Sequence, residues 1–170
     1  DAQNGGFFDT GTDHETLITR PKDIMDNATP AGNSVAIDVL VRLAAFTGEA
    51  AYRERADEYL QPLANLMVEH PQSFGHALGA LDFAVSPAQE FAIVGDPQAS
   101  DTHTLLNTVN SHYQPNSVLA SCAPGDTQAT QSIALLADRP QKEKRATIYV
   151  CQNFACLAPI NEARELEQLL

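Results

Sequence analysis

The stretch that organises this chain covers residues 20–34 and reads RPKDIMDNATPAGNS. It combines two prolines, one glycine, both signs of charge and several short hydrogen-bonding side chains, and it leads into the most apolar segment of the sequence. Thr29 or Asn33 can cap the helix that follows, and Pro30 suits a first helical turn. Polar groups on a rigid loop at the N-terminus of a buried helix are typical of a ligand site. The alternative is a capped loop that only begins a helix.

Helical periodicity dominates the first half of the chain. Residues 34–46 are apolar on nearly every side, which predicts a helix buried on all sides. Residues 49–69 are amphipathic, with Pro62 expected to kink or split the helix, and residues 72–85 predict a third helix. Buried helices alternating with amphipathic ones build toroids of helical hairpins. We therefore expect residues 1–87 to be a segment of helical hairpins.

The periodicity changes near residue 88. Short apolar runs predict strands and longer patterns predict helices, with strands at 90–95, 117–122 and 147–151 and helices at 100–114 and 162–170. A strand, a helix and a strand in succession favour a parallel pair joined by a crossover. We expect residues 88–170 to form a small α/β subdomain with a mostly parallel sheet, which makes the whole chain α+β.

The composition is acidic, with 10 basic and 22 acidic residues among 170 and a formal net charge of −12. Without a basic face, the chain is not expected to bind nucleic acid or an anionic membrane. No apolar run approaches the roughly 18 residues that a membrane span needs. Cys122, Cys151 and Cys156 are an odd number of cysteines without framework spacing, which fits a reducing compartment, so we expect a cytoplasmic protein.

The loop of residues 20–34 supplies the candidate small-molecule site. Arg20 and Lys22 could hold an anion or a hydroxyl-rich ligand, and Asn33 and Ser34 could supply neutral hydrogen bonds at the start of the helix. Asp26 is the catalytic candidate, as an acid or a base. Glycoside hydrolysis needs two opposed carboxylates, and Asp26 has no persuasive partner in this sequence.

Cys151 and Cys156 form a Cys-x4-Cys motif at the end of a predicted strand. The spacing differs from the Cys-x-x-Cys of thioredoxins, and two thiols alone do not supply the four ligands of zinc. His103 and His112 lack partners at ligand spacing, and Gly95 stands where a dinucleotide fingerprint needs three glycines, so we expect neither a metal nor a cofactor. The cysteines are either buried structural thiols or a reversible redox pair.

Several motifs occur in an order that resembles a known family. They are GGFFDT (5–10), RPK (20–22), ATP (28–30), GNS (32–34), FAIVGDP (91–97) and YVCQNFACLAP (149–159). Together they are similar to the C-terminal part of the relatives of spermatogenesis-associated protein 20, in which a thioredoxin-like domain precedes a six-hairpin helical toroid. The resemblance implies that this chain is a piece of a longer protein. It also implies that residues 1–87 are a helical hairpin segment of an incomplete (α/α) toroid.

The resemblance also implies two functions. In the first, loops at one end of the toroid line a cavity that binds or isomerises a sugar-like small molecule; if the protein is an enzyme, epimerase- or isomerase-like chemistry fits better than glycoside hydrolysis. In the second, the chain is a non-catalytic module that supports or redox-partners a thioredoxin-like domain through Cys151 and Cys156. The implied partners are the rest of the parent chain, including that domain, or a second copy bound through an apolar flank.

Overall fold

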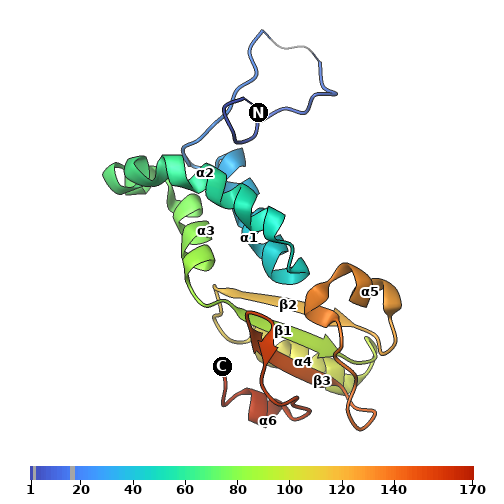
Figure 1. The fold of residues 1–170 in the computed structure, drawn as a ribbon. Helices are drawn as coiled ribbons and strands as arrows, with labels where there is room; N and C mark the ends of the chain where they lie inside the picture. The colour runs from blue at the N-terminus through green and yellow to red at the C-terminus, as the bar shows by residue number, and fades with distance from the viewer. Residues whose placement is uncertain (2, 16–17) are drawn as a thin grey trace. The chain divides into compact units, whose positions relative to one another are not determined.

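Among the described residues, helices follow an irregular segment in the first half of the chain, and the strands all lie in the second half (Figure 1). The computed structural model describes residues 1, 3–15 and 18–170. These residues form two compact units: unit 1 comprises Asp1–Ala44 and Glu49–Val85, and unit 2 comprises Ala45–Gly48 and Ser86–Leu170. Each unit is described separately below.

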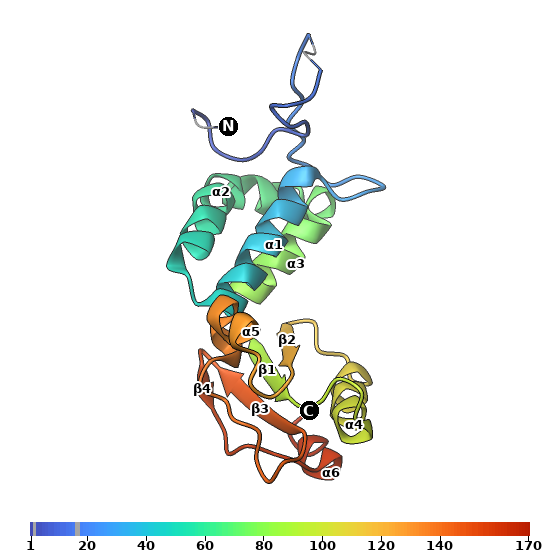
Figure 2. The same cartoon turned by 90° about the vertical axis from the view of Figure 1, so that its right-hand side faces the viewer.

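Unit 1 is a group of three helices preceded by an irregular segment. The helices are α1 (Gly32–Thr47), α2 (Ala50–Glu69) and α3 (Gly75–Val85), with a 3-10 turn η1 (Pro71–Ser73) before α3. The guanidinium of Arg42 on α1 lies 4.6 Å from the ring centroid of Phe83 on α3, and Arg53 on α2 donates a 2.7 Å hydrogen bond to the carbonyl of Ala84. These contacts join both other helices to α3 (Figure 2).

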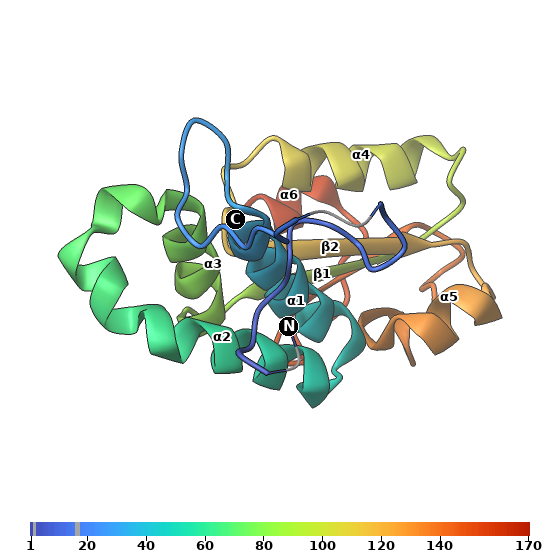
Figure 3. The ribbon, with the colours of Figure 1, turned by 90° about the horizontal axis from the view of Figure 1, so that it is seen from above.

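One expectation for these helices needs correction. Within this chain α1 is buried on one side only, because Val35 and Val39 remain 41% and 49% exposed. Ile37 and Val41 on its other side are buried, and Arg42 of α1 contacts Phe83 of α3. Of the two outcomes predicted for Pro62, a kink or a split, the structure shows a helix α2 that continues to Glu69 and bends along its length (Figure 3).

Unit 2 is built on a four-stranded sheet in the order β2-β1-β3-β4. The strands are β1 (Gln89–Val94), β2 (Ser117–Cys122), β3 (Thr147–Gln152) and β4 (Ala155–Cys156). The helical elements are α4 (Ser100–Asn110), α5 (Thr127–Ser132), α6 (Ala163–Leu166) and the 3-10 turn η2 (Ala134–Leu136). The chain is therefore α+β, as predicted.

The prediction of a mostly parallel sheet is wrong, because the sheet is mixed. The strands β1 and β2 are parallel, joined through α4 as expected, but β3 runs antiparallel to both β1 and β4. The chain between β2 and β3 passes through the short α5 and η2 to the other edge of β1 instead of through a second long crossover helix. A parallel neighbour needs such a crossover, whereas β4 follows β3 directly and must be antiparallel.

The two faces of the sheet carry different side chains, because successive residues of a strand point to opposite faces. One face bears Phe91, Ile93, Ile148 and Val150, which form a buried core with residues of α4 and α6. Helices α4 and α5 lie on opposite sides of the sheet (Figures 2 and 3). The second face is less uniformly apolar and carries Glu90, Ala92, Tyr149 and Cys151.

Candidate functional site

Asp26 joins the loop of residues 20–34 to the N-terminus of α3. One carboxylate oxygen accepts a 2.8 Å hydrogen bond from the N–H of Ala31, and the other accepts from the N–H groups of His76 and Ala77 at 2.8 and 3.3 Å. Burial alone would raise the pKa of Asp26, but these hydrogen bonds and one from Ser34 outweigh it and lower the pKa. The geometry gives the carboxylate a capping role, and its catalytic role stays a prediction.

Asn33 fastens the irregular N-terminal segment to the start of α1. Its side chain is 1% exposed. The amide oxygen accepts from the N–H of Phe7 at 2.7 Å, and the amide nitrogen donates to the carbonyls of Phe7 and Asp23 at 2.9 Å each. Asn33 is thus engaged in three hydrogen bonds with the protein itself.

The two predicted cations are also engaged with neighbouring backbone. Arg20 donates to the carbonyl of Thr10, and its guanidinium lies 4.2 Å from the ring centroid of Phe8. Lys22 pairs with the carboxylate of Asp1 at 3.3 Å and donates to the carbonyl of Gly5. The five predicted residues of this site therefore lie in one region, where each forms hydrogen bonds that stabilise the loop.

A hollow of about 630 Å³ lies against the same loop. Its walls include Asp9, Asp23, Met25 and Thr29, whereas the five predicted residues are not among them. A 3.0 Å hydrogen bond from the N–H of Asp23 to the carboxylate of Asp9 joins two of its walls. Because the charged side chains at the hollow are acidic, it suits a neutral polyol or a cation better than an anion.

The second candidate site is a disulfide between Cys151 and Cys156 in the β3–β4 hairpin of unit 2. The two residues are directly opposed in the strand register, and the turn between the strands places Asn153 and Phe154 at φ values of 51° and 60°. Cys151 is 3% exposed and Cys156 is exposed. The interpretation as buried structural thiols is therefore wrong, because the two are bonded and one of them is accessible.

The guanidinium of Arg139 contacts both sulfur atoms. Its Nη2 lies 3.0 Å from Sγ of Cys156 and 3.7 Å from Sγ of Cys151, and its Nη1 donates to the carbonyl of Ala137 at 2.6 Å. Its Nε is buried without a hydrogen-bond partner among the described atoms. Arg139 is thereby held with one side of its guanidinium against the disulfide.

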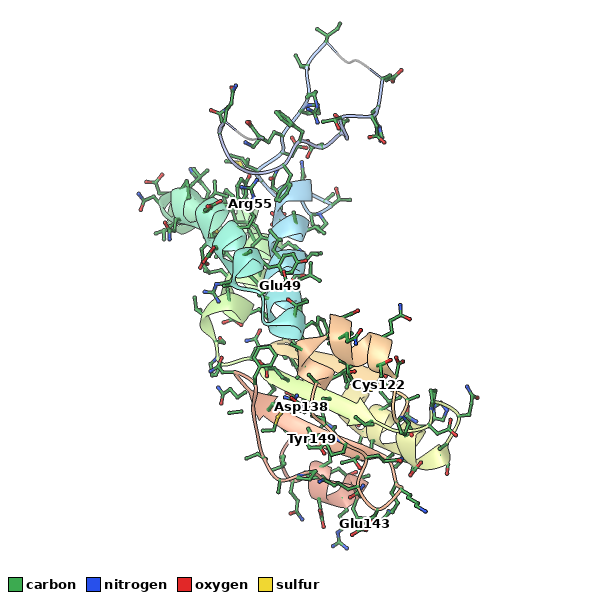
Figure 4. All side chains as sticks on the ribbon, turned by 45° about the vertical axis from the view of Figure 1, so that its right-hand side comes forward. Glu49, Arg55, Cys122, Asp138, Glu143 and Tyr149 are labelled. Carbon is green, nitrogen blue, oxygen red and sulfur yellow. A yellow bond between two sulfur atoms is a disulfide. The ribbon has the colours of Figure 1, made fainter. Side chains whose placement is uncertain are left out.

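Beside the disulfide is a hollow of about 420 Å³. Its walls combine Arg139 and Cys156 with Phe154, Leu157 and Asp138, and Tyr149 also lines it. Figure 4 labels Asp138 and Tyr149 in this part of unit 2. The hydroxyl of Tyr149 donates to the carbonyl of Pro140 at 2.7 Å, which anchors the loop before β3 over the sheet. An incoming group can therefore reach Cys156 along a partly apolar surface.

Glu90 lies on β1, the strand beside this hairpin, and is only 4% exposed. It stands directly across from Cys151 in the register of β1 and β3, and its carboxylate accepts a 2.8 Å hydrogen bond from the N–H of Phe154 at the turn. Burial raises the pKa of Glu90, although the Phe154 N–H and the charge of Arg139 oppose this effect. Glu90, Cys151 and Cys156 thus form one row across three strands.

Sequence reasoning found the two cysteines but missed Glu90 and Arg139. Glu90 does leave a signal, because it is a charged residue at the start of the apolar run EFAIVG. Its proximity to Cys151 depends on the register of β1 against β3, which no local pattern reveals. Arg139 precedes Cys156 by 17 residues in an irregular loop, so no spacing rule connects the two.

The third cysteine, Cys122, is buried at the end of β2 and is labelled in Figure 4. Burial raises the pKa of its thiol, and the charge of Asp126 raises it further. A thiol with a raised pKa reacts slowly, which separates Cys122 from the disulfide chemistry. Within the described residues no three His, Cys, Asp or Glu side chains are grouped to hold a metal, and no helix could cross a membrane.

Comparisons with known proteins relate the whole chain to one group. It is 35% identical over 176 residues to spermatogenesis-associated protein 20 of Rattus norvegicus and to that of Mus musculus, and 35% identical over 173 residues to that of Homo sapiens. These alignments cover 100% of this chain and 22% of each relative. No family model and no solved structure matches the chain.

Proposed function

Because the chain belongs to the spermatogenesis-associated protein 20 family and spans 22% of the length of those relatives, we propose that it is a redox module of a larger protein. In this proposal the Cys151–Cys156 disulfide exchanges with a dithiol of the thioredoxin-like class. The resemblance described above implies such a domain in the parent chain.

The observation that carries the proposal is the unequal accessibility of the two sulfurs. Cys156 is exposed and borders a hollow, whereas Cys151 is buried. Thiol–disulfide exchange depends on access to the attacked sulfur and on the stability of the thiolate that leaves. An exposed cysteine as the point of attack and a buried cysteine as the leaving group fit this reaction.

A reduction assay tests the proposal. The oxidised protein, with Cys122 replaced by serine, is added to a thioredoxin-class protein that is kept reduced by NADPH and its reductase. We expect NADPH oxidation equivalent to one disulfide per chain, and much slower opening by a simple monothiol at the same thiol concentration. If consumption does not exceed that of the matched Cys156→Ser variant, the redox proposal is wrong.

We propose a second function for unit 1, as part of a helical toroid that binds or isomerises a sugar-like small molecule. The supporting observation is the hollow of about 630 Å³ against the loop of residues 20–34, with the carboxylates of Asp9 and Asp23 and the hydroxyl of Thr29 in its walls. Hydroxyl-rich ligands form hydrogen bonds with such groups. Isomerase-like chemistry fits better than glycoside hydrolysis, because hydrolysis needs two opposed carboxylates and Asp26 has no persuasive partner.

A thermal-shift screen with sugars and amino sugars tests this second function. A ligand at one hundred times its Kd should stabilise the protein by about 2.7 kcal/mol. We expect Asp23→Asn to abolish the shift and Asp57→Asn, on the exposed side of α2, to preserve it. A shift that is equal in both variants would place the ligand elsewhere.

The exposed face of α1 supports the proposed partner, which is the remainder of the parent chain. Val35 and Val39 are one helical turn apart and present apolar surface to solvent. Most of each relative lies outside the matched segment, so a longer parent chain would have further residues that could cover this face. A second copy of the chain is the alternative occupant.

A further inference from the structure

The guanidinium of Arg139 is the cation that contacts the disulfide. Arg139 contacts both sulfurs and also interacts electrostatically with the buried carboxylate of Glu90. Tyr149 on β3 and Asp138 in the preceding loop also face the guanidinium. While the disulfide is intact, the sulfurs are neutral and Glu90 is the buried counter-charge of Arg139.

We infer that Arg139 is a catalytic residue of the exchange, whose guanidinium stabilises the thiolates released when the Cys151–Cys156 bond opens. This inference rests on the proposed disulfide exchange. It assigns a function to a residue that has no recognisable sequence motif, and it follows from the 3.0 and 3.7 Å distances between Nη2 and the two sulfur atoms.

The reaction balances in two steps. A thiolate of the partner dithiol attacks Sγ of Cys156, which forms a mixed disulfide and releases Cys151 as a thiolate. The second partner thiolate then attacks the partner sulfur of that mixed disulfide and releases Cys156 as a thiolate. The partner dithiol is oxidised to a disulfide, and the two electrons reduce Cys151 and Cys156. Arg139 is within reach of the leaving sulfur in each step.

Without a cation, the first step would be unfavourable at this place in the fold. Cys151 is buried, and burial disfavours a thiolate. Glu90 stands directly across the sheet from Cys151, and its ionised form would repel a new negative charge. Arg139 opposes both effects, and the hydrogen bond to the carbonyl of Ala137 already holds it in place. The guanidinium is thus positioned before the bond opens.

Titration of the reduced thiols tests the inference. In the Cys122→Ser background, thiolate absorbance is followed against pH for the unmutated Arg139 and for Arg139→Met and Arg139→Lys. We expect Arg139→Met to raise the lower of the two thiol pKa values by about one to two units, because an adjacent opposite charge shifts a pKa by this amount. Arg139→Lys should restore part of the difference.

Arg145→Met is the matched control, because Arg145 is exposed and its guanidinium pairs with Glu162 at 2.7 Å. It removes the same charge from unit 2, and we expect it to leave the thiol pKa values unchanged. Circular dichroism and thermal unfolding check that each variant folds. If Arg139→Met does not fold, Arg139→Lys remains as the test variant.

The outcomes separate this inference from the proposed function. If a thioredoxin-class dithiol opens the disulfide but Arg139→Met leaves the thiol pKa values unchanged, the role of Arg139 is wrong and the redox proposal stands. If the dithiol does not open the disulfide of the unmutated chain, the redox proposal fails whatever the titration shows. An equal shift of the thiol pKa in Arg145→Met would show that the effect comes from net charge alone, and it would also overturn the inference.

Discussion

Replacing Asp26 with alanine is expected to lower the free energy of unfolding of unit 1 by about 2–3 kcal/mol. The variant leaves the N–H groups of Ala31, His76 and Ala77 without the acceptor that they share. Hydrogen bonds to a charged group are worth more than neutral ones, and part of this site is shielded from water. Denaturant unfolding followed by circular dichroism measures the loss.

The control for Asp26 is Asp57→Ala in the same unit. Asp57 forms a half-exposed i,i+4 pair with Arg53 at 3.0 Å, and helix pairs of this kind contribute less than about 1 kcal/mol. Equal losses in the two variants would contradict the capping role of Asp26.

The effect of Asp26 should also depend on pH. Because folding lowers the pKa of this carboxyl, the unfolded chain takes up the proton first as the pH falls. The stabilisation is therefore complete above the unfolded pKa, near pH 4, and is lost as the pH falls through the folded pKa. We expect the difference between the unmutated protein and Asp26→Ala to shrink in that acidic range and to be constant near neutrality.

Replacing Glu90 with alanine is expected to lower the free energy of unfolding of unit 2 by about 2–4 kcal/mol. The variant removes the buried acceptor of the Phe154 N–H and leaves the half-buried Arg139 without its counter-charge. Because the turn then loses its support, the disulfide should also be opened faster by a dithiol. Unfolding and reduction rates are measured on the same preparations.

Glu143→Ala is the control, since Glu143 is an exposed residue of unit 2 (Figure 4). Glu90→Gln removes the charge but keeps the shape of the side chain, and its amide oxygen can still accept the hydrogen bond from the Phe154 N–H. The pKa of Glu90 is raised in the folded state, so the ionised group costs stability as the pH rises through that pKa. The Gln variant should lack this dependence, and an unchanged pH profile would contradict the assignment.

The longer elements could be predicted because their periodicity is local. Helices α1, α2 and α4 and strands β1, β2 and β3 lie within a few residues of the predicted ranges. The direction of β3 could not be predicted, because it depends on the path of the chain after β2. The strand β4 has two residues and α5 has six, with the polar sequence TQATQS, so neither carries a readable pattern.

In the candidate sites, too, the local features could be predicted and the long-range contacts could not. The loop residues were recognisable as hydrogen-bonding groups, but their partners lie as far as 51 residues away, as for Asp26 and Ala77. The cysteine pair was recognisable from its spacing. Its charged neighbours were not, because Glu90 meets Cys151 only through strand register and Arg139 meets both sulfurs only through the folding of a loop.

The most direct test of the redox account is to trap the exchange and locate the bond. Oxidised protein in the Cys122→Ser background is mixed with a thioredoxin-class protein whose second active-site cysteine is serine, and the adduct is mapped by peptide mass spectrometry. The account predicts a mixed disulfide at Cys156, the exposed sulfur. No adduct, or an adduct mainly at the buried Cys151, would contradict it.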